Sequence, residues 1–97
     1  MPFPSTTGHF FNDSYVRANA PNRSGVYGLY TQTQWFYVGE SDDIQRRLLE
    51  HLSESGTCIS RHAPTGFIYE LAEASSRVAR QNALIRELAP ACNQKLG

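Results

Sequence analysis

The chain has 97 residues, enough for one domain with one modest hydrophobic core, and its 40% hydrophobic and 19% charged residues are ordinary for a globular protein. The formal net charge is zero, which argues against a protein that holds nucleic acid only by neutralising phosphates. Eight of the nine basic residues are arginine, however, and arginine is the better bidentate ligand for a phosphate. Charge alone therefore leaves nucleic-acid binding open.

The sequence carries no pattern typical of a membrane or secreted protein. No apolar run approaches the roughly 20 residues that a helix needs to cross a bilayer. The first residues lack the positive start and the long apolar stretch of a secretory signal. We therefore expect a cytoplasmic (intracellular) protein without a membrane partner.

The two cysteines, Cys58 and Cys92, lie far apart in the sequence and form no CxxC pattern. Disulfides are rare in intracellular proteins. We expect two buried or half-buried thiols rather than a disulfide, and we expect no histidine to join them in a zinc site.

Residues 1–24 are rich in proline, serine, threonine and asparagine. This composition favours an irregular arm with room for one helical turn, followed by turn-forming residues. We expect Phe10, Phe11 and Tyr15 to pack against the domain proper, which we assign to residues 25–97.

Two aromatic and β-branched segments follow, at residues 25–30 and 35–38. Only residues 31–34 separate them, so the pattern predicts an antiparallel hairpin. Gly39 is expected to end the second strand.

An amphipathic helix is predicted next. Residues 41–43 supply an N-cap and an acidic first turn. Ile44, Leu48 and Leu52 recur every four residues and form an apolar stripe that is expected to end near Gly56.

Residues 57–65 are expected to form a loop, and residues 66–71 a third strand. The order of elements is then β-β-α-β-α, a small three-stranded antiparallel sheet flanked by helices in an α/β (α+β) fold. The order is not a βαβ series with a glycine-rich phosphate loop, so nucleotide binding of the Rossmann or P-loop kind finds no support.

The last predicted helix begins at a cap formed by Ser75 and Ser76 and stops at Pro90, which lacks an amide hydrogen. Helical spacing places four residues on its inward face, which are Val78, Gln81, Ile85 and Leu88. Gln81 stands where an aliphatic side chain would pack better. An unpartnered buried amide costs roughly 1–3 kcal/mol, so we expect Gln81 to bind a ligand or, alternatively, the backbone or water.

Several short motifs in this context resemble the GIY-YIG nuclease family, which includes the N-terminal nuclease of bacterial excision-repair endonucleases. The motifs are Gly25-Val26-Tyr27, Tyr37-Val38-Gly39 and Arg47, followed by a helix that ends in Pro90 and Asn93. Each motif alone is weak, but the spacing is specific, because intervals of ten, ten and four residues separate Tyr27, Tyr37, Arg47 and His51. The resemblance covers residues 25–93 and implies the fold of that family and its hydrolysis of phosphodiester bonds.

The resemblance also implies catalytic roles. Tyr27 is our first choice for positioning or deprotonating the attacking water, with Tyr37 as its orienting partner; a tyrosine with its ordinary pKa of about 10 can do this only if cations lower that pKa. Arg47 would clamp the scissile phosphate. His51, one helical turn further on, would hydrogen-bond the phosphate or relay a proton. The alternatives are core packing for the tyrosines, a solvated arginine and a structural histidine.

Four further residues are candidates for substrate binding, namely Gly39, Arg46, Arg61 and Asn93. Arg46 also fits a solvated surface arginine. Asn93 would support the site from behind the residues that touch the substrate.

Two positions depart from the family pattern. Glu40 follows the second motif where many members have a lysine, and an acid there weakens the positive field, although it can pair with an arginine. Gln81 stands nine residues before Pro90, where the family has its metal-binding glutamate. Glutamine keeps the size of glutamate but removes the charge that Mg²⁺ or Mn²⁺ prefers in a ligand. We interpret the chain as a deliberately inactivated variant, with a natural homologue that binds without cutting as the alternative.

The leading hypothesis is a Mg²⁺- or Mn²⁺-dependent endonuclease that acts on nucleic acid, with DNA favoured over RNA. One alternative is a non-catalytic nucleic-acid-binding or adaptor module that uses the same surface. Another is an interaction domain whose motifs are coincidental. Cutting both strands with one site per chain would favour a homodimer.

Overall fold

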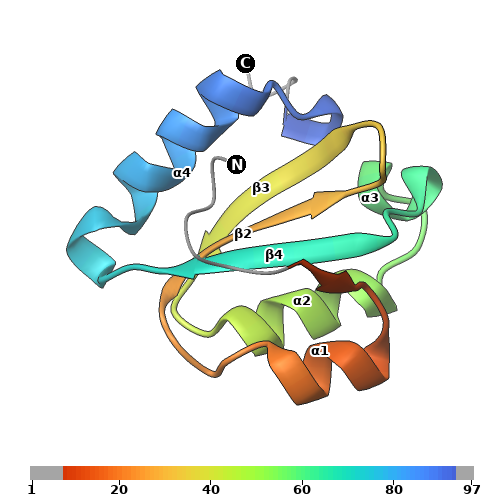
Figure 1. The fold of residues 1–97 in the computed structure, drawn as a ribbon, viewed down its shortest axis with the longest axis horizontal. Helices are drawn as coiled ribbons and strands as arrows, with labels where there is room; N and C mark the ends of the chain where they lie inside the picture. The colour runs from red at the N-terminus through yellow and green to blue at the C-terminus, as the bar shows by residue number, and fades with distance from the viewer. Residues whose placement is uncertain (1–7, 94–97) are drawn as a thin grey trace.

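The computed structural model describes residues 8–93, in which a four-stranded antiparallel sheet lies between two layers of helices (Figure 1). The strands follow the order β1–β4–β2–β3. In chain order the elements are β1 (His9–Phe10), α1 (Asp13–Asn19), β2 (Gly25–Tyr30), β3 (Trp35–Ser41), α2 (Ile44–Ser53), α3 (Cys58–His62), β4 (Gly66–Leu71), α4 (Ala74–Leu88) and the 3-10 helix η1 (Ala91–Asn93). None of these helices has the length and apolar character needed to cross a membrane. The predicted α+β architecture is confirmed, with four strands instead of three.

β2 and β3 form the predicted hairpin, and β2 lies between β3 and β4. Gly39 pairs with Tyr27, and Ser41 pairs with Gly25, so β3 continues beyond the glycine. The prediction that Gly39 ends the strand is therefore wrong. A glycine inside a strand often marks the close approach of another group, and here that group is the ring of Tyr27.

The described part of the N-terminal segment is more regular than the expected arm. β1 pairs with Gly66 and Phe67 at the start of β4, and α1 packs beside α2 with Val16 fully buried (Figure 1). Asn12 caps α1, because its side chain accepts a hydrogen bond from the amide of Tyr15. Residues 1–7 lie outside the described part of the chain, and the division into an arm (1–24) and a domain (25–97) stays a prediction.

The three aromatic residues of this segment differ in burial. Phe11 packs against the core, as expected, with its ring edge-on to Phe67. Phe10 and Tyr15 are 64% and 43% exposed and pack edge-to-face against each other. The expected packing against the domain holds for Phe11 and fails for the other two.

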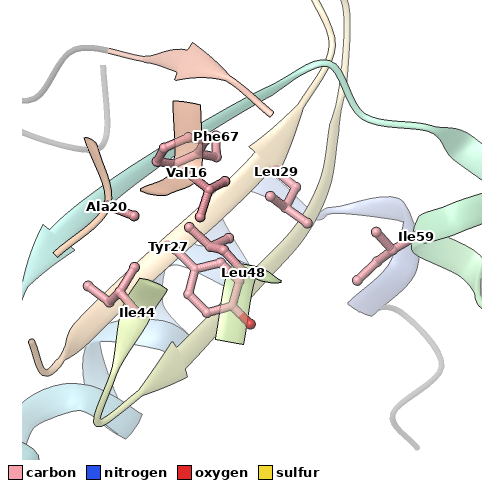
Figure 2. Packing of buried hydrophobic residues seen from close by; sticks show 8 residues of the cluster. All are labelled: Val16, Ala20, Tyr27, Leu29, Ile44, Leu48, Ile59 and Phe67. Carbon is pink, nitrogen blue, oxygen red and sulfur yellow. The ribbon is translucent and has the colours of Figure 1, made fainter. Parts of the chain in front are cut away.

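Side chains on the two faces of the sheet form two hydrophobic clusters, because successive residues of a strand point to opposite faces. On one face, β2 and β4 pack against α1 and α2, in a cluster of Val16, Ala20, Tyr27, Leu29, Ile44, Leu48, Ile59 and Phe67 (Figure 2). On the other face, α4 covers a smaller cluster of Val26, Val38, Ile68 and Leu84. Tyr27 therefore faces α2, while its neighbour Val26 faces α4.

α2 has the predicted cap and apolar stripe, but its first turn carries no acidic residue, because Asp43 is the cap itself. Asp43 caps it by accepting a hydrogen bond from the amide of Arg46. Ile44 and Leu48 are fully buried, whereas Leu52 is 36% exposed and lies at the rim. The helix ends at Ser53, a little earlier than predicted.

A short helix, α3, stands within the segment 57–65, where a loop was expected. Thr57 and Ser60 form a capping box, in which each side chain accepts a hydrogen bond from the backbone amide of the other. These bonds satisfy donors that a helix N-terminus leaves free, and they stabilise a helix of only five residues. Ala63 ends the helix in a left-handed conformation with φ 49°. The loop prediction is wrong because local capping outweighs the weak helical pattern.

α4 is the predicted last helix, but it begins earlier than expected. Its N-cap is Glu73, which makes no side-chain capping bond, so Ser75 and Ser76 lie inside the helix instead of capping it. The helix ends as predicted, with Ala89 in a left-handed conformation directly before Pro90.

The buried face of α4 also differs from the prediction. Val78 is 53% exposed, and the fully buried residue is Leu84. Ile85 and Leu88 are partly buried against the same cluster, as expected. Gln81 is half-buried. The helix is rotated relative to the predicted face because arginines on it pair with carboxylates of the sheet, as described below.

Cys58 and Cys92 form a disulfide, which overturns the expectation of two free thiols. Their Cα atoms lie 5.7 Å apart although 34 residues separate them in the sequence. They meet because α3 and η1 both pack against β3. A contact of this kind depends on the tertiary fold and leaves no local trace in the sequence.

The rotation of α4 predicts unequal effects of two substitutions. Leu84→Ala should lower the free energy of unfolding by about 3 kcal/mol, because it leaves a cavity under the helix. Val78→Ala, at an exposed position of the same helix, should cost less than about 1 kcal/mol. Urea denaturation followed by circular dichroism measures both values. Equal losses would mean that the other face of α4 meets the sheet.

Candidate active site

The hydroxyl of Tyr27 lies 2.7 Å from Nε2 of His51, and the two residues are only 1% and 4% exposed. Tyr27 comes from the inner strand β2, and His51 comes from the last turn of α2. Ile44 and Leu48 lie two turns and one turn before His51 on the same stripe, and their burial fixes the helix against the sheet. The hydrogen bond therefore joins a strand and a helix that the core already holds in place.

Tyr37 and Gly39 on β3 complete the aromatic part of the cluster. The ring centroid of Tyr37 lies 6.1 Å from that of Tyr27 and 5.3 Å from that of His51. A Cβ on Gly39 would overlap the hydroxyl of Tyr27 and lie 2.8 Å from Cε2 of Tyr37. Glycine is needed here for the close approach of both rings to the backbone.

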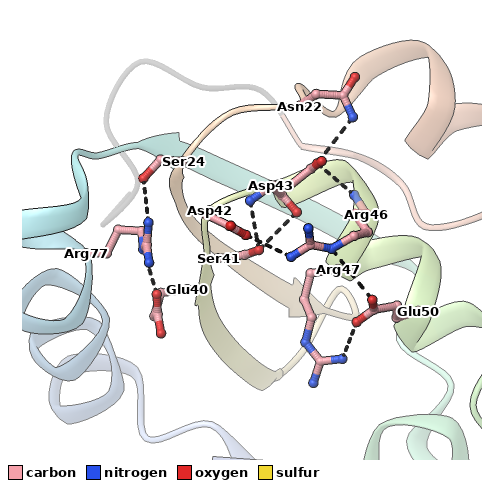
Figure 3. A network of polar contacts seen from close by, with 10 residues as sticks. All are labelled: Asn22, Ser24, Glu40, Ser41, Asp42, Asp43, Arg46, Arg47, Glu50 and Arg77. Atoms are coloured by element: carbon pink, nitrogen blue, oxygen red, sulfur yellow. Dashed lines mark hydrogen bonds and ion pairs between the residues drawn. The ribbon is translucent and has the colours of Figure 1, made fainter.

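Arg47, one turn before His51 on α2, brings positive charge to the cluster. Its Nη1 lies 2.9 Å from Oε1 of Glu50 and 3.7 Å from Oε2 of Glu54. The Arg47 side chain is 35% exposed, so the guanidinium forms the solvent-accessible side of the cluster. Figure 3 shows Arg47 and Glu50 side by side on α2.

Burial sets the protonation of Tyr27 and His51. Removal from water raises the pKa of Tyr27 well above its usual range; Tyr37 adds to this effect and Arg47 opposes it. Burial, together with the charge of Arg47, lowers the pKa of His51 to about 4. At neutral pH, Tyr27 is therefore a phenol and His51 a neutral imidazole.

The other nitrogen of His51 suggests which tautomer is present. Nδ1 is buried and has no hydrogen-bond partner among residues 8–93, and it lies 3.6 Å from Oε1 of Glu54. A proton on Nδ1 faces this carboxylate and leaves Nε2 free to accept the hydroxyl hydrogen of Tyr27. In this tautomer, Tyr27, His51 and Glu54 form a line along which a proton can move.

On the other face of the sheet, α4 is held by two ion pairs. Nε of Arg77 lies 2.7 Å from Oε1 of Glu40 on β3, and its Nη1 lies 3.1 Å from Oγ of Ser24 (Figure 3). Arg80 pairs with Glu70 of β4, at 2.9 Å. Glu40 thus pairs with an arginine, which is the arrangement that compensates an acid at this position.

Gln81 lies on α4, one turn after Arg77, and so belongs to the layer opposite α2. Within residues 8–93, no hydrogen bond or ion pair connects its side chain to another residue. The structure therefore brings together Tyr27, Tyr37, Arg47 and His51, while Gln81 belongs to α4, the helix that packs on the opposite face of the sheet.

The side chains present do not match the ligands of a magnesium site. Hard divalent cations take carboxylate oxygens in proteins. Gln81 offers a neutral amide, while the carboxylates of Glu40, Glu50 and Glu54 each lie within ion-pair distance of an arginine. Across residues 8–93, no group of three metal-ligating side chains converges on the tyrosine cluster.

The remaining candidate residues lie at different depths. Asn93 is buried, and its carboxamide accepts from the amide of Val38 at 2.8 Å and donates to the carbonyl of Val38 at 3.1 Å. It therefore supports β3 from behind. Arg46 is exposed and pairs with Asp42 at 2.8 Å. Arg61 is exposed on α3 and donates to a backbone carbonyl of the preceding turn.

Glu50 and Glu54 belong to the cluster, although neither is part of the sequence motifs. Each follows a cluster residue by three positions, Glu50 after Arg47 and Glu54 after His51. Residues three apart on a helix are neighbours. An acid three positions after a candidate arginine or histidine is therefore the signal that would have found them.

Comparisons with known proteins identify the family and support the fold. The family model of the GIY-YIG catalytic domain matches residues 23–88. The GIY-YIG N-terminal endonuclease domain of UvrC from Thermotoga maritima, bound to magnesium as its catalytic divalent cation, has a similar fold, with a TM-score of 0.69 at 18% identity over 80% of this chain and 94% of that chain. A tyrosine-to-phenylalanine mutant of the same domain gives a TM-score of 0.70 at 17% identity over 82% of this chain and 96% of that chain. No curated protein matches the chain in sequence.

The family match begins just before β2 and ends with α4. It includes the hairpin that carries Tyr27 and Tyr37, the helix that carries Arg47 and His51, and the helix that carries Gln81. It covers well over half of the chain. The chain therefore belongs to the family of GIY-YIG catalytic domains.

Proposed function

We propose that this domain binds the phosphodiester backbone of nucleic acid, with DNA as the favoured substrate, at the cluster of Tyr27, Tyr37, Arg47 and His51. The observation that carries the proposal is the hydrogen bond between Tyr27 and His51 beside a partly exposed guanidinium. This arrangement places a guanidinium that can bind phosphate next to the hydroxyl of Tyr27 and the neutral imidazole of His51. Family membership supports the further step that the reaction at this cluster is endonucleolytic hydrolysis.

Arg47 is the residue that we assign to the phosphate. A guanidinium offers two parallel donors to phosphate oxygens and stays charged at any working pH. Glu50 on α2 and Glu54, the residue that caps the end of α2, hold it in place, and both side chains are partly exposed. A phosphate can therefore replace them without any change of backbone. Because β3 is an edge strand, a nucleic-acid backbone lying across that edge can reach both layers of the domain.

Tyr27 and His51 provide the route for the proton. A phenol with a raised pKa is not a tyrosinate at neutral pH, so the condition for Tyr27 to act as a base by itself, a pKa lowered by nearby cations, is not met. Tyr27 instead takes a proton from the attacking water while it gives its own proton to Nε2 of His51. Glu54, beside Nδ1, stabilises the imidazolium that results. Tyr37 orients the water, since its ring packs against both Tyr27 and His51.

Phosphate binding makes His51 a better base in this scheme. The positive charge of Arg47 is one of the causes that lower the pKa of His51. A phosphate on Arg47 offsets that charge and moves the pKa back toward its ordinary value. Substrate binding and proton acceptance are thus coupled through one guanidinium.

Residue 81 decides, in this proposal, whether the domain cuts. With glutamate there, the chain would have a carboxylate for Mg²⁺ or Mn²⁺, which stabilises charge on the phosphate and on the leaving oxygen. With Gln81 the chain binds its substrate and cleaves poorly, as an inactivated variant would. The second candidate is a natural non-catalytic binding or adaptor module, favoured by the absence of a matching carboxylate set among residues 8–93. A glutamine codon at position 81 of the native gene would favour that second candidate.

Gln81→Glu should produce divalent-cation-dependent nicking of DNA, because it restores a charged ligand for the metal. The measurement uses labelled duplex, branched and single-stranded DNA with Mg²⁺ or Mn²⁺, followed on denaturing gels. Asn82→Glu is the matched control, since it adds the same charge at an exposed position one residue further on. A nick needs one active site, so the result does not depend on a homodimer. Absence of nicking on every substrate, or equal nicking by the Asn82 variant, contradicts the proposal.

Arg47→Ala should weaken DNA binding much more than Arg46→Ala does. Loss of a charge-assisted phosphate contact costs about 1.5–3 kcal/mol, which is roughly a ten- to hundredfold change in Kd. Arg46 already pairs with Asp42 at the surface, and its removal should change Kd by less than about threefold. Fluorescence anisotropy at several salt concentrations measures both effects, and the Arg47 variant should also lose about one unit of salt dependence. Similar losses for both variants would move the binding surface elsewhere.

The stability of the domain should fall as the pH is lowered from about 6.5 to about 4, because of His51. Folding lowers the pKa of His51 from 6.5 to about 4, so in this window the unfolded chain takes up a proton that the folded chain excludes. The contribution, on the order of 3 kcal/mol, is fully present above pH 6.5 and is lost by about pH 4. Urea denaturation at a series of pH values measures it. His51→Gln should flatten the dependence, whereas His62→Gln, at an exposed histidine, should not.

A further inference from the structure

A cluster of potential metal ligands lies where α3 meets η1. The ligand atoms of Cys58, His62 and Cys92 all lie within 4.8 Å of one another. The two sulfurs are joined in the disulfide, and His62 lies beside it without taking part in the bond. Neither phosphate binding nor the proposed proton route uses any of these residues.

We propose that, when the disulfide is reduced, Cys58, His62 and Cys92 bind a zinc ion in its place. Thiolate and imidazole are the ligands that zinc prefers in proteins, and its usual geometry is tetrahedral. Three protein ligands leave the fourth position to water. The proposal is independent of the nuclease function.

The short helix α3 presents two of the ligands with fixed spacing. Cys58 and His62 are four residues apart, so they lie one above the other on the same helical face. The same spacing places two histidines on one zinc ion in helical zinc motifs. The capping box of Thr57 and Ser60 caps the N-terminus of α3, and Ala63 is the C-cap. The helix is therefore held at both ends although it has only five residues.

The imidazole of His62 is oriented by the sheet. Its ring stacks on the buried ring of Phe36 in β3, with centroids 4.7 Å apart and an interplanar angle of 19°. Stacking occupies the face of the imidazole and leaves its edge, which carries both nitrogens, free for a metal. His62 is exposed, so an ion can reach it from solvent. Fixing the ring beforehand lowers the entropy cost of binding.

Disulfide and zinc site exclude each other, because zinc binds thiolates and a sulfur in a disulfide is not a thiolate. A dithiol reductant gives two electrons and two protons to the Cys58–Cys92 bond and itself becomes a disulfide. Zn²⁺ then displaces the two thiol protons and accepts a lone pair from a ring nitrogen of His62. Two protons are released to solvent for each ion bound.

Either link would hold η1 against α3. η1 carries Asn93, whose side chain forms hydrogen bonds with the backbone amide and the backbone carbonyl of Val38, the residue between Tyr37 and Gly39. In the reduced, metal-free chain, η1 would be held against β3 only by the hydrogen bonds of Asn93 and by packing, without a covalent bond to α3. Zinc would thus replace, under reducing conditions, the anchor that the disulfide gives under oxidising conditions.

The first test is a metal titration of the whole chain after reduction and anaerobic removal of the reductant. Cobalt(II) serves as the spectroscopic probe, because thiolate ligands give it a charge-transfer band in the near ultraviolet and tetrahedral geometry gives it strong visible bands. The expected result is one cobalt ion per reduced chain, displaced by zinc, and no thiolate band from the oxidised chain. Failure of the reduced wild-type chain to give the band overturns the proposal without any variant.

His62→Phe is the variant that isolates the third ligand. It keeps an aromatic ring against Phe36 and removes the ligating nitrogen. Its zinc affinity should fall by more than about tenfold, since loss of even an outer-shell partner of a metal site costs that much. His9→Phe, at a partly buried histidine on β1, is the matched control and should bind zinc like the wild type.

Thermal unfolding gives a second readout. Zinc should raise the midpoint of the reduced wild-type and His9→Phe chains, and should raise that of His62→Phe by clearly less at the same zinc concentration. The oxidised forms of all three should unfold in cooperative transitions, which verifies that the variants fold. Unchanged zinc affinity in His62→Phe, or one zinc ion shared by two chains, would refute the three-ligand site.

Discussion

The close approach of the Tyr27 phenol to the backbone of β3 is the constraint on which the site depends. Because Gly39 has no side chain, the phenol can lie across the hairpin and reach Nε2 of His51. His51 in turn sits on the helix whose Ile44 and Leu48 fill the core, so the hydrogen bond joins a strand and a helix whose spacing the core fixes. The same burial moves the pKa values of Tyr27 and His51 in opposite directions and keeps both groups neutral. Packing and protonation therefore have a single cause.

The second layer is organised by charge. Val26 pairs with Glu40 on one side and with Glu70 on the other, so two carboxylates flank it in one row of the sheet. Each meets an arginine of α4, and the side chains of these pairs are between 19% and 31% exposed. Pairs of this kind contribute little to stability on average, but they select one rotation of the helix. That rotation sets the direction in which the side chain at position 81 leaves the helix.

Local patterns predicted the hairpin, the helix with the Arg47–His51 spacing and the strand that follows, because each depends on residues close in sequence. Contacts between segments that are far apart in the sequence could not be predicted. Cys58 and Cys92 meet only because two short helices pack on the same strand. The face of α4 was misread because hydrophobic spacing favoured Val78, whereas ion pairs to the sheet bury Leu84. The direction of the tyrosine pKa could not be predicted from the sequence, because it depends on burial, which is a property of the fold.

The carboxamide of Asn93 has a consequence for how chains can associate. β3 is an outer strand, and an outer strand normally offers its amides and carbonyls as a template for another molecule. At Val38 both groups are already occupied, by a side chain that imitates a peptide unit. Edge-to-edge growth of the sheet, the first step of β-type polymerisation, is blocked at this point. Asn93, which stabilises the strand that carries Tyr37, therefore also protects this position of the edge strand against pairing with another chain.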